Sequence, residues 1–94
     1  MKFKAVTYDK ENDVLYVQFS EADVVRTNAL DDLRLVDYAA DGTAVGIEFI
    51  GASEGIDLTE VPHDQQIPEL LAAAKLKLPI SRGDRSTKKS SKVV

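Results

Sequence analysis

Asp37 and Glu48 are the two acidic residues best placed for acid–base or metal chemistry. They lie in successive alternating segments, and a hairpin would bring them close to each other or to Arg34. Two neighbouring carboxylates can exchange a proton or hold a divalent cation. The simpler interpretation, which we favour, is that they are exposed hairpin charges that keep a sheet from aggregating. A small hydrolase or metal-dependent enzyme centred on this pair is therefore the least favoured hypothesis.

Other candidate metal ligands are too few or wrongly spaced. The single histidine, His63, is followed by Asp64, but a metal site needs three or four ligands with supporting hydrogen bonds. Asp9, Glu11 and Asp13 alternate as in a calcium loop, yet the required glycine and distal glutamate are absent. We interpret His63 as a solvated loop residue and expect no metal and no cofactor.

Nucleophilic catalysis finds equally little support. The chain has no cysteine, which excludes disulfides, thiolate zinc sites and a cysteine nucleophile. The segment 51–55 is flanked by glycines around Ser53, but it lacks the spacing of a nucleophile elbow or a phosphate loop. We interpret it as the exit from a strand. The sequence therefore predicts no catalytic residue and a protein that is not an enzyme.

The elements that carry these residues are mostly strands. Alternating apolar and polar residues predict four strands, at 2–8, 14–19, 33–38 and 44–50. Polar turn residues at 9–13 and the Asp41-Gly42 pair join them into two hairpins. A fifth short strand at 24–27 stays open. We expect an α+β fold with an antiparallel β-meander of four or five strands.

One C-terminal amphipathic helix is expected after a connector at 51–66. Its apolar stripe has helical spacing, with Pro68 in the first turn and Pro79 as the terminator. The stripe residues are Ile67, Leu70, Leu71, Ala74 and Leu78. This stripe either covers one face of the sheet or docks on a second subunit.

The three tyrosines suggest a second apolar surface. Tyr8, Tyr16 and Tyr38 are expected on the sheet face away from Leu15 and Val17. If both faces are apolar, the helix covers only one, and the other forms a homodimer interface.

Charge divides the chain into an acidic body and a basic tail, although the net charge is −4. Residues 1–74 hold five Lys and Arg against fifteen Asp and Glu, a difference of −10, whereas residues 75–94 hold seven against one. We expect a single domain at 1–80 and a disordered basic tail at 81–94. Its cations, which could contact phosphates, are Arg82, Arg85, Lys88, Lys89 and Lys92. A nucleic-acid-associated regulator is therefore one alternative.

Several short blocks together resemble a known family. They are Tyr8-Asp9, Asp13 to Val17, Leu35 to Tyr38, Asp41-Gly42, and Val45 to Glu48 followed by Ala52-Ser53. This pattern resembles the small bacterial domain-of-unknown-function 2283 family over about residues 3–53. The resemblance implies a compact β-hairpin domain and no established activity. Relatives encoded beside small toxin-like proteins suggest an antitoxin or another partner-binding role.

The function expected from these features is a non-enzymatic protein–protein interaction or regulatory module, with an antitoxin-like role as its sharpest form. We expect a homodimer with a toxin-like protein partner. We also expect a cytoplasmic protein with no membrane association, because no apolar stretch resembles a signal peptide or a spanning helix.

Overall fold

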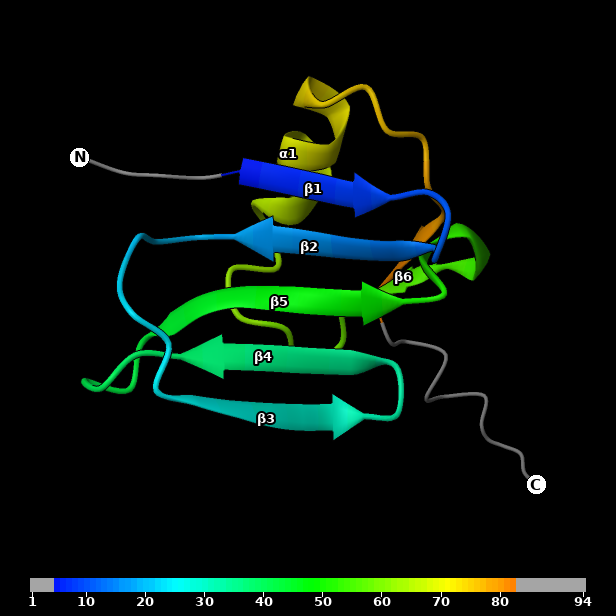
Figure 1. Ribbon diagram of the computed structural model, residues 1–94. Coiled ribbons are helices and arrows are strands. Elements are labelled where there is room, and N and C mark those ends of the chain that lie inside the picture. The colour runs from blue at the N-terminus through cyan, green and yellow to red at the C-terminus, as the bar shows by residue number, and fades with distance from the viewer. Residues whose placement is uncertain (1–4, 83–94) are drawn as a thin grey trace.

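The computed structural model describes residues 5–82, which form one five-stranded antiparallel sheet, one α-helix and a small parallel strand pair. This confirms the predicted α+β class. The elements in chain order are β1 (Ala5–Asp9), β2 (Val14–Gln18), β3 (Arg26–Asp31), β4 (Arg34–Tyr38), β5 (Ala44–Ile50), the 3-10 turn η1 (Ala52–Glu54), β6 (Ile56–Asp57), α1 (Ile67–Ala73) and β7 (Ile80–Ser81). Figure 1 shows the sheet in front of α1.

Both predicted hairpins form, but the sheet is not a simple meander. The strand order is β1-β2-β5-β4-β3, so β2 pairs with β5 rather than with the strand that follows it. The chain leaves β2 and crosses to the far edge, and β3, β4 and β5 then return toward β2 (Figure 1). This order places β5, the strand with the most buried residues, at the centre. Alternation specifies strands and faces, whereas the pairing order depends on which apolar strand gains most from two neighbours.

The possible short strand at 24–27 is present, but it lies further along the chain. It covers Arg26–Asp31 and pairs with β4 at one edge of the sheet. Most of its side chains are exposed, so no apolar alternation marks it in the sequence.

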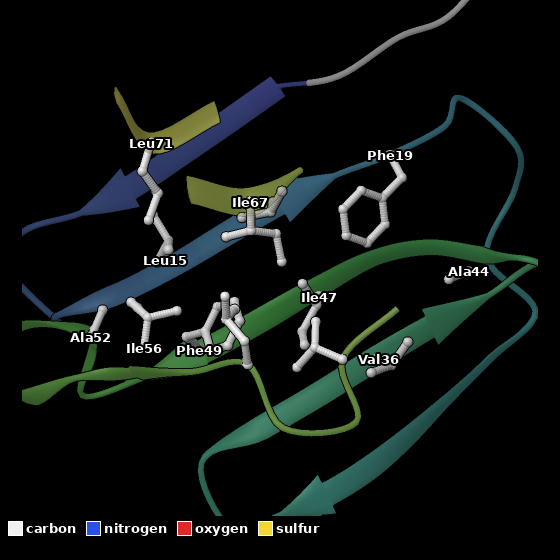
Figure 2. Packing of buried hydrophobic residues seen from close by; sticks show 13 residues of the cluster. Leu15, Phe19, Val36, Ala44, Ile47, Phe49, Ala52, Ile56, Ile67 and Leu71 are labelled. Atoms are coloured by element: carbon white, nitrogen blue, oxygen red, sulfur yellow. The ribbon is translucent and has the colours of Figure 1, made fainter. Parts of the chain in front are cut away.

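The core lies on one face of the sheet (Figure 2). Leu15 and Val17 of β2 and Ile47 and Phe49 of β5 meet residues from the connector and from α1 there. The fully buried contributors from beyond the sheet are Ala52, Ile56, Leu58, Ile67 and Leu71. The helix therefore packs on its own sheet, and the segment interpreted as a plain connector supplies part of the core.

The helix is shorter than predicted. It ends at Ala73, and Lys75 adopts a left-handed conformation with φ of 61°. The Leu76 N–H donates to the Leu71 carbonyl at 2.9 Å, and the Lys75 N–H donates to the Ala72 carbonyl at 3.0 Å. These are the two hydrogen bonds of a Schellman motif, which closes a helix without the help of Pro79. Leu78 consequently lies beyond the helix, and Ala74 is exposed.

The chain after the helix forms a strand where the basic tail was expected to begin. Ile80 and Ser81 of β7 pair in parallel with Ile56 and Asp57 of β6. Ser81 therefore belongs to the fold, and Arg82 forms an ion pair with Asp64. The rest of the predicted tail, from residue 83 onward, lies outside the described residues. Within residues 5–82, no helix is long and apolar enough to cross a membrane.

Candidate functional site

The acidic pair singled out in the sequence lies on the sheet face opposite the core. Cross-strand partners show which residues share this face, because directly opposed side chains point to the same side. Glu48 pairs with Tyr16 of β2 and with Leu35 of β4, and Asp37 pairs with Gly46. Asp37 and Glu48 are thus diagonal neighbours on β4 and β5. We name this surface, which faces the viewer in Figure 1, the open face.

A hydrogen-bonded network occupies its centre. The Tyr16 hydroxyl donates to Asp37 Oδ2 at 2.8 Å, and the Thr27 hydroxyl donates to Asp37 Oδ1 at 2.5 Å. Both oxygens of this carboxylate therefore accept a hydroxyl hydrogen bond, one from the adjacent strand β3 and one from β2, on the far side of β5. The Glu48 carboxylate makes no hydrogen bond or ion pair with another residue between positions 5 and 82.

Tyr16 is held in its protonated form. Burial raises its pKa well above the usual range, and the hydrogen bond to Asp37 and the negative charges of Asp37 and Glu48 add to the effect. A tyrosine with this pKa is a hydrogen-bond donor at neutral pH rather than a base or a nucleophile. The network is thus suited to fixing side-chain positions.

Gly46 makes the arrangement possible. A Cβ at this position would collide with the Tyr16 ring and hydroxyl and would lie 2.8 Å from the Val17 carbonyl oxygen. The tyrosine therefore reaches Asp37 by passing over a residue without a side chain. A glycine in the interior of a strand is the sequence signal for such a close approach.

Arg34 does not join the acidic pair, contrary to the expectation. Its side chain is buried on the opposite side, where Nε and Nη2 donate to Asp31 Oδ2 at 3.1 and 2.9 Å. Nη1 donates to the carbonyls of Asp57 and Thr59 at 3.0 and 2.6 Å. The Arg34 hydrogen bonds hold the pKa of Asp31 below its usual value. Arg34 ties β4 to the segment that follows η1.

Asp13, considered above as one member of a loose calcium loop, is instead a structural junction. Its carboxylate accepts hydrogen bonds from the Tyr8 hydroxyl at 2.6 Å, the Ser53 N–H at 2.8 Å and the Ser53 hydroxyl at 2.6 Å. Its carbonyl accepts the Gly51 and Ala52 N–H groups. The Ser53 and Tyr8 hydrogen bonds lower the pKa of Asp13. Segment 51–55 therefore contains a 3-10 turn fastened to the first hairpin.

The predicted cluster of three tyrosines is wrong. Only Tyr16 lies on the open face, because Tyr8 pairs with Leu15 and Tyr38 packs against the core. Tyr38 also lies under the Arg26 guanidinium, with 4.4 Å between the guanidinium carbon and the ring centroid. The open face is consequently half apolar and half polar.

The histidine pair does not form a site either. His63 is exposed and its ring lies against Phe19, with ring centroids 4.6 Å apart, whereas Asp64 pairs with Arg82 at 2.9 Å. Among the described residues, no three His, Cys, Asp or Glu side chains are grouped so as to hold a metal ion.

Comparison with known proteins adds a family. Residues 5–53 match the family described as "Protein of unknown function (DUF2283)". The chain belongs to this family. The DUF2283 match covers all five strands of the large sheet, the Tyr16–Asp37 network and the Asp13–Ser53 junction, but not α1, β6 or β7. No curated protein and no solved structure matches the chain.

Proposed function

We propose that this protein is a non-enzymatic, cytoplasmic interaction module that forms a homodimer and binds a second protein through the open face. Its sharpest form is an antitoxin-like role, in which the partner is a small toxin-like protein. The supporting observation is that α1 and the connector cover one face of the sheet and leave the other without a covering layer among residues 5–82.

The composition of the open face suits protein binding. Val14, Leu35 and Ile50 share this face with Tyr16 and are only half buried. Tyrosine supplies large contact area at low entropic cost and is enriched at the centres of interfaces. Tyr16 is already fixed by Asp37, so little further ordering is needed when a partner binds.

Charge indicates the chemistry of the partner. The open-face positions of the five strands include Asp9, Asp37 and Glu48 but neither lysine nor arginine. An acidic, partly apolar surface favours a partner that presents basic and apolar side chains together, because opposite charges speed encounter and disfavour wrong partners.

The network also favours binding over catalysis. Both Asp37 oxygens already accept hydrogen bonds from hydroxyl groups, and Tyr16 stays protonated at neutral pH. A general base must lie within hydrogen-bond reach of the proton that it removes, and the protons within reach of Asp37 here are those of the Tyr16 and Thr27 hydroxyls. The hydroxyl groups and the carboxylate of this cluster are hydrogen-bonded to one another, which supports a structural role rather than a catalytic one.

Affinity purification of the tagged full chain from its native cells, at low salt, tests this function. We expect a basic protein to co-elute in a fixed ratio and to dissociate as salt is raised, since exposed charge pairs are screened. Elution of the chain alone under these conditions would contradict partner binding.

A further inference from the structure

An apolar groove lies on the side of α1, outside the region that the family match covers. It has a volume of about 460 Å³ and runs between the helix and the segment that follows it, with Leu71, Leu76 and Ile80 among its lining residues. Ile80 is 40% exposed although it is a large apolar side chain. Apolar surface that stays accessible in a groove of this size is typical of a binding site.

Two lysines give the groove its charge. Lys75 and Lys77 line it, both are exposed, and neither side chain makes a hydrogen bond or an ion pair with a residue between positions 5 and 82. Among residues 5–82, no acidic side chain lines the groove. An occupant should therefore combine apolar side chains with negative charge.

Another segment of the same chain has this chemistry. Between β2 and β3, Val24 and Val25 are 47% and 59% exposed, and they follow Glu21 and Asp23 directly. The other large apolar residues exposed within residues 5–82 are Leu33 and Ile80. Three of these four exposed apolar residues thus lie on two separate surfaces. Ile80 lies in the groove beside basic residues, and Val24 and Val25 lie beside acidic ones.

The acidic segment is held in shape at both ends. The Ala22 N–H donates to the Ser20 hydroxyl at 2.9 Å, and the Val25 N–H donates to the Tyr38 carbonyl at 2.8 Å. A segment fixed in this way loses little conformational freedom when it binds.

The segment does not fill the groove of its own chain. In Figure 1 the connection between β2 and β3 lies at the left end of the sheet, whereas the segment between α1 and β7 lies at the upper right. The exposure of Val24 and Val25 agrees with this separation. A complementary contact between the two surfaces therefore needs two molecules.

We infer that the groove formed by Leu71, Lys75, Leu76, Lys77 and Ile80 binds the segment 21–25 of a second copy of this chain. In a two-fold dimer the contact occurs twice, because each subunit offers both surfaces. This inference rests on the homodimer in the proposed function and names the surfaces that form it.

Charge reversal in both surfaces tests the inference by sedimentation equilibrium of the full chain at low salt. One variant carries Lys75→Glu and Lys77→Glu, and the other carries Glu21→Lys and Asp23→Lys. Each alone brings like charges together in both contacts, so we expect its dimer dissociation constant to rise by about tenfold or more. An equimolar mixture of the two variants has opposite charges in both contacts and should recover the heavier species.

Substitutions of exposed apolar residues provide a second test with a matched control. Val24→Ser with Val25→Ser should weaken the dimer, whereas Leu33→Ser, at an exposed leucine outside both surfaces, should leave the dissociation constant unchanged. A dimer that is insensitive to the charge reversals would overturn the inference and leave the proposed homodimer to another surface. A wild-type chain that is monomeric at every concentration would overturn both, and would leave the groove to a different protein.

Discussion

The Tyr16 hydroxyl and the Asp37 carboxylate, 21 residues apart in the chain, are joined at 2.8 Å across the central strand of the sheet. The bond links β2 to β4 without contacting β5 side chains, because Gly46 lies between them. It fixes the one aromatic side chain that the five described strands place on the open face. The protein therefore presents a preformed polar centre on the surface that we assign to partner binding.

Replacing Tyr16→Phe removes this bond while keeping the ring. We expect the free energy of unfolding to fall by about 1 kcal/mol at neutral pH, the value for a partly exposed hydrogen bond to a charged acceptor. Chemical denaturation followed by circular dichroism measures the change. A variant as stable as the wild type would show that the hydrogen bond contributes nothing.

The same bond makes stability depend on alkaline pH. The pKa of Tyr16 is raised in the folded state, so its stabilising effect is complete below the unfolded pKa of about 10 and is lost as the pH rises further. The stability difference between wild type and Tyr16→Phe should therefore narrow above pH of about 10. A difference that grows with pH would contradict the assigned direction.

Gly46→Ala tests the close approach of Tyr16 to the backbone. The added methyl collides with the tyrosine and with the Val17 carbonyl, so we expect a loss of about 2 kcal/mol in unfolding free energy. In a Tyr16→Ala background the loss should be smaller, because one of the two obstacles is gone. Equal losses in the two backgrounds would place the tyrosine elsewhere.

Asp13 should be the most sensitive polar residue of the first hairpin. Asp13→Ala removes the acceptor for Tyr8 and Ser53 and leaves alanine at φ of 59°, so we expect the melting temperature to fall by on the order of 5 °C or more. Asp13→Asn keeps a side chain that tolerates this conformation and should lose less. Equal losses in the two variants would show that the left-handed backbone conformation at position 13 does not contribute to the effect.

The strained end of the helix allows a stabilising change. Lys75→Gly relieves the left-handed conformation at the Schellman position, and we expect a gain of about 0.5–1 kcal/mol in unfolding free energy. Lys77→Gly loses a lysine from the same groove without that relief and serves as the control. The two variants should differ in sign, as measured by chemical denaturation.

Much of the sheet could be predicted from the sequence because burial on one face imposes a period of two. Val14 to Gln18 and Ala44 to Ile50 show this period clearly, and both are strands. The edge strand β3 is mostly exposed on both faces, so its hydrogen bonds to β4 define it and its composition does not. The strand order could likewise not be predicted from the sequence, because β2 and β5 pair only after the chain has crossed the sheet.

The predictions of the helix end and of the tyrosine cluster were wrong for related reasons. The apolar spacing continues to Leu78, but the chain must turn back after Ala73 to let β7 pair with β6. Tyr38 follows a register shift in β4 and packs with the core rather than beside Tyr16. Both outcomes depend on contacts made by distant segments.

The candidate site was predicted only in part. Asp37 and Glu48 do lie on adjacent strands of one face, as alternation requires. Tyr16 and Thr27, which donate hydrogen bonds to Asp37, come from strands whose pairing with the second hairpin was not predicted, and the only local signal was Gly46.

The most direct test of partner binding through the open face compares two leucines. Leu35 lies on that face beside Glu48 and is half buried, whereas Leu33 is exposed in the turn before β4. Leu35→Lys introduces a positive charge opposite the expected basic partner, and Leu33→Lys carries the same change outside the face. The measurement is the dissociation constant of the co-purified partner for each variant, after circular dichroism has confirmed that both are folded. We expect Leu35→Lys to weaken binding by about tenfold or more and Leu33→Lys to leave it within about twofold of wild type. Equal affinities for the two variants would contradict the assignment of the open face.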